Sequence, residues 1–389
     1  MRQLRDLPSM IRVHPEDESI ALPELLGNSF FTKSDSAITV SSVKDERLSN
    51  VADTVISYDL FGILPLKTVE VIHTQDIYLV PGGSAVGITI RTQGVLVVGL
   101  GTVDTAQGAL SPGAAAGIQA GDVILRADGQ NVENADQLAR MAKRSDGTMQ
   151  LELEREQETV QATIQLVQDV DDGENKIGLW VRDSTAGVGT LSFVDHQTGW
   201  FAALGHPVSD IDTQSLLTVR EGKVIPTEIV DIKKGEQGSP GELIGVFSVS
   251  GPSMGSIKKN TEYGIFGKTE QTYQNPLYSE IPLGYAGEAH TGKAKLLATI
   301  SKDGVEEYEC EVVRVNPQTD AATKGMVIHI TDQRLLDKTG GIVQGMSGCP
   351  VIQDGRLIAV VTHVFVNDPT RGYCVYAEWM RSKMLDAVS

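Results

Sequence analysis

The second half of the sequence is a succession of short apolar segments separated by turn residues. From residue 173 onward the segments are "IGLWVRD", "GTLSFVD", "KVIPTEIVDI", "LIGVFSV", "AKLLATI" and "EEYECEVVRV". Alternation of apolar and polar residues is typical of strands with one buried face. Strands that follow one another in this way favour a sandwich or a barrel. We expect only two short helices here, over "DQRLLDKTG" and over "EWMRSKMLDAV" at the end of the chain.

Residues 84–167 are predicted to form a separate unit. In "SPGAAAGIQAGDVILRADG" small residues open a short helix, a Gly-Asp turn leads into a strand, and Asp128-Gly129 makes a tight turn. The segment "NADQLARMAKRS" predicts a helix with Asn134 as its N-cap and Gln137 as the capping-box partner. Two alternating strands, "MQLELERE" and "TVQATIQLV", close the unit.

This unit resembles a bacterial PDZ domain, and the run "SPGAAAGIQAGDVILRADG" carries the resemblance. A PDZ domain binds an extended peptide by adding it as a strand to a sheet edge. The resemblance implies a carboxylate-binding loop near Ala85, Val86, Gly87 and Ile88. The alternative is a PDZ-like fold that serves only as a spacer.

Two further segments precede this unit. Residues 1–50 form a polar N-terminal segment with weak periodicity, and no strand is predicted there. Residues 51–83 form an N-terminal β segment, in which "KTVEVIH" shows a period of two. Residues 173–389 make up the remaining, mainly β domain.

Charge and cysteine content exclude some classes of function. The formal net charge of −18 argues against nucleic acid as a partner, because phosphates need a basic surface. Cys310, Cys349 and Cys374 are too few and too scattered for a disulfide framework or a zinc site, so we expect buried thiols and no metal or cofactor. No apolar run near residue 1 is long enough for a signal peptide or a membrane span, which leaves a cytosolic protein or a leader missing from this chain.

The segment "GGIVQGMSGCPVIQDGRLIAVVTHVF" raises the question of serine chemistry. A serine hydroxyl needs a base to take its proton and donors to hold the developing oxyanion. Glycines around Ser347 allow the backbone N–H groups of Gly345 and Ser347 to point into one site. Glycine–serine turns are also common in purely structural roles.

The base must come from the seven histidines. His206 follows small and apolar residues in "GWFAALGHPVSDID", where a Gly-His-Pro turn holds it at a strand end. His363 lies in "AVVTHVFVND", which we expect to be a buried strand. Taken by itself, a histidine in this setting is more often a structural residue than a base.

The arrangement of these motifs is more specific than each one. "GHPVSDID", "HITDQRLLDKTGGIVQGMSGCP" and "GRLIAVVTHVFVNDPTRGYCVYAEWM" together resemble the stage IV sporulation protein B family of serine peptidases. "LFGILPLKTVEV", the PDZ-like unit and "GTLSFVD" extend the resemblance over roughly Tyr58 to Met380. It implies a mainly β protein, with a PDZ domain followed by a trypsin-like double β-barrel serine peptidase domain.

The resemblance also implies roles for individual residues. His206 matches the base of the family, Ser347 the nucleophile and Asp332 the acidic residue, in the order His, Asp, Ser. Relatives usually carry serine where Cys349 stands. The cysteine is therefore either a rival nucleophile or a substitution that changes only the packing.

The third catalytic position has three competing residues. Asp210 and Asp212 follow His206 closely and can reach its ring from the same loop, whereas Asp332 is favoured by the resemblance. The other interpretation of Asp332 is an N-cap of the helix over "QRLLDKTG".

The family implies a biological setting. Its members are made in the forespore, are exported to the space between the two membranes, and cleave a membrane-bound regulator of an intramembrane metalloprotease. That cleavage leads to processing of a sporulation sigma factor, and relatives also cleave themselves. The alternatives are an inactive peptidase fold acting as a PDZ scaffold, a general quality-control protease, and a cytosolic peptide-binding protein.

Overall fold

The computed structural model describes residues 76–318 and 320–387. Before residue 76 it describes only four strands, β1 (Met10–Val13), β2 (Phe31–Ala37), β3 (Thr54–Leu60) and β4 (Leu64–His73). They form one sheet in the order β1-β4-β3-β2, with β1 parallel to β4. The strands predicted within 51–83 are therefore confirmed, whereas β1 and β2 lie in the segment where none was predicted. The rest of segment 1–50 lies outside the described residues.

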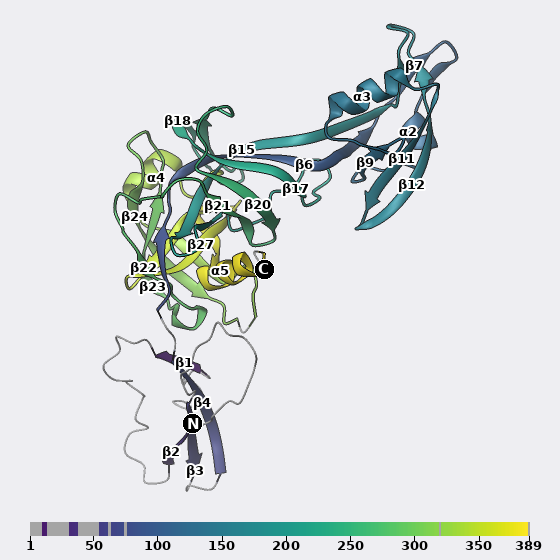
Figure 1. The fold of residues 1–389 in the computed structure, drawn as a ribbon. Helices are drawn as coiled ribbons and strands as arrows, with labels where there is room; N and C mark the ends of the chain where they lie inside the picture. The colour runs from purple at the N-terminus through teal and green to yellow at the C-terminus, as the bar shows by residue number, and fades with distance from the viewer. Residues whose placement is uncertain are drawn as a thin grey trace.

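Two six-stranded barrels form the main body of the molecule (Figure 1). The first closes because its two end strands, β6 and β15, pair with each other. Its strands, in order around the barrel, are β6 (Ala85–Leu100), β17 (Val219–Pro226), β20 (Gly255–Thr261), β21 (Gly264–Thr269), β16 (Trp200–Ala203) and β15 (Leu179–Asp195). The predicted double β-barrel is confirmed.

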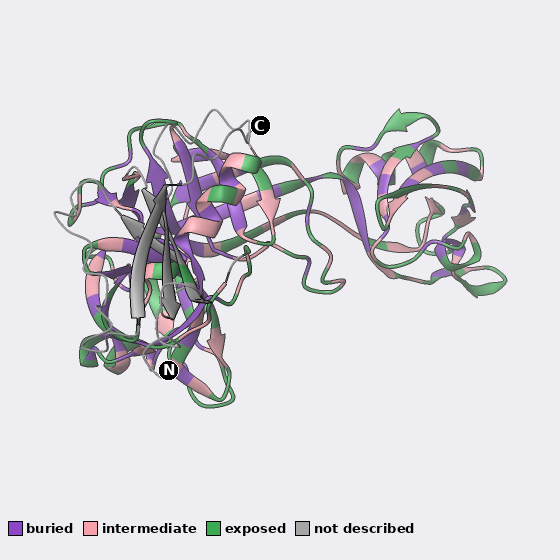
Figure 2. Ribbon diagram, turned by 90° about the horizontal axis from the view of Figure 1, so that it is seen from below, coloured by how far each residue is buried: buried purple, intermediate pink, exposed green. Residues whose placement is uncertain are grey.

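The second barrel is closed by a continuous ladder of antiparallel pairs. Its strands, in order, are β23 (Gly292–Ala298), β24 (Glu306–Val315), β25 (Met326–Ile330), β28 (Asp368–Tyr376), β27 (Arg356–Phe365) and β26 (Pro350–Gln353). The turn between β26 and β27 is Asp354-Gly355, where both residues have positive φ, as a tight hairpin requires. Figure 2 shows buried stretches along the strands of the main body and of the separate unit.

The predicted PDZ unit stands away from the barrels at the end of a two-stranded ribbon (Figure 1). The ribbon is made of β6 and β15, which pair from Thr190 opposite Ala85 to Leu179 opposite Leu100. The far half of β6 continues into the sheet of the unit, which also contains β9 (Val123–Ala127), β10 (Gln130–Asn131), β11 (Thr148–Arg155) and β12 (Glu158–Gln165). The near half of β6 is a barrel strand, so the predicted boundary at residue 84 falls inside the first barrel.

The predicted helices all form. They are α2 (Pro112–Ala115), α3 (Ala135–Arg144), α4 (Gln333–Thr339) and α5 (Ala377–Asp386). Asn134 caps α3 by accepting a hydrogen bond from the Gln137 N–H at 2.8 Å. The Gln137 side chain accepts instead from the N–H of Glu133, one residue before the expected partner.

The remaining elements are short. They are β5 (Tyr78–Pro81), β7 (Val103–Thr105), β8 (Gly108–Leu110), β13 (Val167–Gln168), β14 (Asn175–Lys176), β18 (Glu228–Lys233), β19 (Glu242–Val246), β22 (Ile281–Pro282) and the 3₁₀ turn η1 (Ala286–Glu288). Within the described part of the chain, no helix has the length and apolar character needed to cross a membrane.

Candidate active site

The turn that carries Ser347 is held against the first barrel by Thr190 of β15. The Thr190 N–H donates to the Ser347 carbonyl at 3.0 Å, and the Thr190 hydroxyl donates to the Gly345 carbonyl at 2.8 Å. On the other side, the Gly348 N–H donates to the carbonyl of Val361 in β27. The turn is therefore fixed between the two barrels.

Glycine is required at position 348. Its φ is +102°, and a Cβ built there would lie 2.1 Å from the Thr190 carbonyl oxygen and 2.8 Å from the Leu204 nitrogen. Only a residue without a side chain allows the backbone to approach β15 this closely. The glycine that follows the serine thus brings the two barrels together at this point.

The Ser347 hydroxyl donates to the carbonyl of Thr362 in β27 at 3.0 Å. The side chain is half-buried, so it lies at the surface of the molecule rather than in its core. Ser347 therefore satisfies the first structural requirement of a nucleophile, which is access to a substrate.

His206 reaches the same strand from the first barrel. It follows β16 after a turn in which Leu204 and Gly205 both have positive φ. A Cβ at Gly205 would lie 3.0 Å from the Thr362 side chain, so the turn packs directly on β27. The His206 and His363 rings are 5.2 Å apart between their centres, with planes inclined by 40°. Ser347 and His206 therefore converge on Thr362 and His363.

The environment of His206 selects one tautomer. Its Nδ1 lies 2.8 Å from the carbonyl oxygen of Pro207. Because a carbonyl only accepts, Nδ1 carries the proton and Nε2 keeps a free lone pair, as a general base requires. Burial lowers the pKa of His206 below its ordinary value of 6.5, which keeps the ring neutral. Among the described residues, no hydrogen bond joins this ring to Ser347.

Two backbone donors in the serine turn have no partner among the residues that the structure describes. The N–H groups of Met346, Gly348 and Cys349 donate to backbone carbonyls. Within the described ranges, those of Gly345 and Ser347 donate to no other group. These are the two donors predicted to form an oxyanion hole, and the positive φ of Gly345, +95°, gives the turn its shape.

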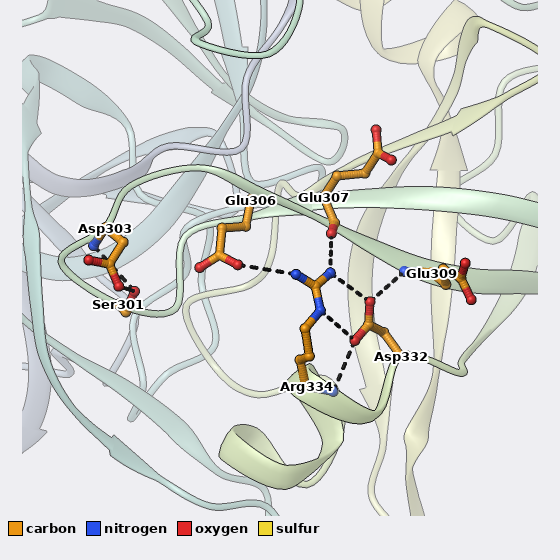
Figure 3. A network of polar contacts seen from close by, with 7 residues as sticks. All are labelled: Ser301, Asp303, Glu306, Glu307, Glu309, Asp332 and Arg334. Carbon is orange, nitrogen blue, oxygen red and sulfur yellow. Dashed lines mark hydrogen bonds and ion pairs between the residues drawn. The ribbon is translucent and has the colours of Figure 1, made fainter.

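Asp332 makes its contacts away from His206. Its carboxylate accepts from the Arg334 backbone N–H at 2.9 Å and from the Glu309 N–H at 3.2 Å, and it pairs with the Arg334 guanidinium at 2.8 Å (Figure 3). The hydrogen bonds from Arg334 lower the pKa of Asp332. The alternative interpretation, that Asp332 caps α4, is confirmed, and its catalytic role stays a prediction.

Asp210 and Asp212 also face another partner. Both pair with Arg182 of β15, and the Asp210 side chain is fully buried. Although burial opposes its charge, hydrogen bonds from Thr213 and Arg182 lower the pKa of Asp210. Neither carboxylate bonds to His206; instead, the pair ties the loop after His206 to the ribbon.

Cys349 is a buried thiol. Its Sγ lies 3.6 Å from the Thr190 hydroxyl, and burial raises its pKa to about 12. A thiol that stays protonated is a poor nucleophile. Cys310 and Cys374 are also buried and unpaired, so the prediction of ordinary buried thiols is confirmed.

The residues predicted to form the peptide-binding loop lie in the first barrel and not in the PDZ unit. Ala85, Val86, Gly87 and Ile88 are buried in β6 within the first barrel. From Val86 to Ile88, β15 pairs on one side of the strand and β17 on the other. A peptide cannot add to a strand whose two edges are occupied, so this assignment is wrong.

The structure leaves another sheet edge free in the PDZ unit. Residues 179–182 of β15 pair with β6 on one side, and their other edge has no strand partner among the described residues. Helix α3 lies beside this part of β15. Leu179 and Val181 are partly buried against the core of the unit, together with Met141 of α3. The sequence feature that could have indicated this edge is "KIGLWV", a glycine followed by an alternating strand. It lies outside residues 84–167, where the PDZ unit was predicted.

Comparisons with known proteins gave the following matches. The PDZ domain family matches residues 103–155, and no curated protein matches the chain. The PDZ domain of an SdrC-like protein from Listeria monocytogenes is 21% identical and covers 24% of this chain and 90% of its own, with a TM-score of 0.19. The HtrA-type protease AlgW, solved with a decapeptide, is 11% identical and covers 57% of this chain and 55% of its own, with a TM-score of 0.31.

The peptidase domain has a family match of its own. The sequence model of the SpoIVB peptidase S55 family matches residues 173–381, which is more than half of the 389 residues. This range contains the serine turn, the His206 loop and the whole second barrel. The chain is a member of the SpoIVB peptidase S55 family.

Proposed function

We propose that the protein is a serine endopeptidase in which Ser347 attacks the scissile carbonyl and His206 takes the proton of the serine. The observation that carries this proposal is the convergence of the serine turn and the His206 loop on β27, beside two backbone donors that bond to no other group in the described part of the chain. Family membership supports the same reaction.

The chemistry follows from the atoms present. Ser347 Oγ must turn from the Thr362 carbonyl toward Nε2 of His206, the nitrogen that the Pro207 contact leaves unprotonated. The proton passes from Oγ to Nε2 as the bond from Oγ to the substrate carbon forms. His206 then gives this proton to the leaving amine. The N–H groups of Gly345 and Ser347 hold the oxyanion meanwhile.

The PDZ unit supplies a second contact with a protein substrate. We propose that an extended peptide segment adds to the free edge of β15 at residues 179–182, between this strand and α3. Met141→Glu places a charge beside this strand edge. We expect it to abolish peptide binding, measured by fluorescence of the exposed Trp180, while active-site labelling continues. Unchanged peptide binding would move the site away from this edge.

The family suggests the physiological role. We propose that the protein is exported from the forespore to the intermembrane space during endospore formation. There it cleaves a membrane-bound regulator of an intramembrane metalloprotease, which permits processing of a sigma factor, and it also cleaves itself. This part of the proposal rests on family membership. Cleavage-site mapping on the candidate regulator tests it, and broad digestion of casein would favour a general quality-control protease instead.

An inactive scaffold is the second candidate function. The observation in its favour is that the Ser347 hydroxyl donates to Thr362 rather than to His206. Labelling with a fluorophosphonate distinguishes the two candidates. The peptidase proposal expects labelling that Ser347→Ala removes and that Ser209→Ala, a change at an exposed serine in the His206 loop, leaves intact. Absence of labelling in the folded wild-type protein would support the scaffold.

A further inference from the structure

His363 faces out of the second barrel because β27 contains an irregularity. Val361, two residues earlier, is fully buried, and strict alternation would turn His363 to the same side. The pairing of β27 with β28 shifts register between Val361 and His363. Such a bulge re-aims the following side chain. The strand before it is buried as expected, whereas His363 itself is exposed.

The bulge brings His363 to the catalytic histidine. The two ring centres are 5.2 Å apart, which is within the range of direct packing between aromatic rings. His363 also follows Thr362, whose carbonyl accepts the hydroxyl of Ser347. One short segment of β27 therefore contacts both the nucleophile and the base.

The base has little else to fix its orientation. In serine peptidases a carboxylate usually holds the far nitrogen of the base. Across residues 76–318 and 320–387, no carboxylate bonds to His206, and its only hydrogen bond is to the Pro207 carbonyl. A single hydrogen bond leaves the imidazole free to swing about it, so a packing contact is needed to define the ring plane.

We propose that His363 is a positioning residue that acts through His206. Its ring packs against the imidazole and keeps Nδ1 on Pro207 and Nε2 toward Ser347. His363 takes no proton in the reaction, which passes between Ser347, His206 and the leaving amine. Partial desolvation where the ring packs against its neighbours, followed by the charges of His206 and Lys324, lowers the pKa of His363, so the ring stays neutral beside the imidazolium that forms. This inference rests on the proposed peptidase function.

Two substitutions test the role. His363→Ala removes the ring, and His363→Phe keeps an aromatic ring of similar size without nitrogen atoms. For His363→Ala we expect kcat and the fluorophosphonate labelling rate to fall about a hundredfold, the scale of a 1 Å misplacement, with KM nearly unchanged. His363→Phe should restore both rates to within a few-fold of wild type. His290→Ala, at an exposed histidine of the same barrel, is the matched control and should change neither rate.

Each other outcome counts against the proposal. A wild-type rate in His363→Ala would show that the base needs no support from this ring. A rise in KM alone would make His363 a substrate-binding residue. Equal losses in the Ala and Phe variants would point to a role for its nitrogen atoms rather than for packing. Thermal melting of each variant excludes unfolding. Failure of the peptidase proposal is a separate result, because the wild-type protein would then not label.

Discussion

Alanine at position 348 should displace the nucleophile turn from β15 while leaving the second barrel folded. The added Cβ would lie 2.1 Å from the Thr190 carbonyl oxygen, whereas real Cβ contacts stay above 3.0 Å. The turn must therefore retreat by about 1 Å, a distance that can cost a hundredfold in rate. Because Ser347 precedes this residue, its hydroxyl moves with the turn.

The loss of stability can be estimated from the same contacts. Retreat of the turn breaks the two hydrogen bonds from Thr190 to the carbonyls of Ser347 and Gly345, at about 1 kcal/mol each. The left-handed backbone at φ +102° adds about 1–3 kcal/mol for a residue with a side chain. The free energy of unfolding should thus fall by about 3–5 kcal/mol.

Gly355→Ala is the matched control. Gly355 also has a positive φ, +76°, but nothing lies within 4 Å of a Cβ built there. We expect a loss of only about 1–2 kcal/mol, from the left-handed backbone, and no change in the labelling rate. Urea unfolding and fluorophosphonate labelling measure the two quantities. Equal stability losses in the two variants, with normal labelling in Gly348→Ala, would refute the close contact between the serine turn and β15.

Four further predictions concern the same site. Cys349→Ser should keep labelling within a few-fold of wild type, because a thiol with a pKa of about 12 is not the nucleophile. Loss of labelling would support Cys349 as the nucleophile. Asp332→Asn should keep most activity, because the described contacts of Asp332 do not include His206 and asparagine caps α4 equally well; a thousandfold loss of rate would instead support the catalytic role predicted for Asp332. The rate at pH 6.5 should exceed half of its plateau in a pH profile, because the lowered pKa of His206 keeps the base mainly neutral there; a midpoint above 6.5 would contradict this. Arg182→Met should lower the free energy of unfolding by about 1–3 kcal/mol, because it removes a partner of the buried Asp210, and unchanged melting would show that the pair is dispensable.

Local chemistry explains what the sequence predicted correctly. Asp128-Gly129 forms a tight turn because both residues adopt positive φ. Asn134 caps α3 because its amide oxygen reaches the N–H three residues on. Glycines beside Ser347 and His206 make both residues recognisable as candidates in the sequence, and their catalytic roles stay predictions. Each of these signals is contained within a few neighbouring residues.

What the sequence did not predict depends on pairing between distant strands. Nothing local separates residues 85–91 of β6, which belong to a barrel, from the residues after them, which belong to the PDZ unit. The bulge that exposes His363 exists only in the register of β27 against β28. The N-cap role of Asp332 was predicted, but its contact with the Glu309 N–H depends on the position of β24. These features require the assembled sheet.

The shared ribbon determines where the chain can be shortened. Deleting residues 84–167 would take a strand out of the first barrel and expose the edges of β15 and β17. Across the ribbon, however, Arg91 lies directly opposite Ser184. A two-residue Asn-Gly turn in place of residues 92–183 can therefore close the ribbon as an ordinary hairpin, with Asp210→Asn added because Arg182 is removed. The PDZ unit is thus a long hairpin loop of the peptidase, and it can be exchanged for another ligand-binding module without altering the order of the barrel strands.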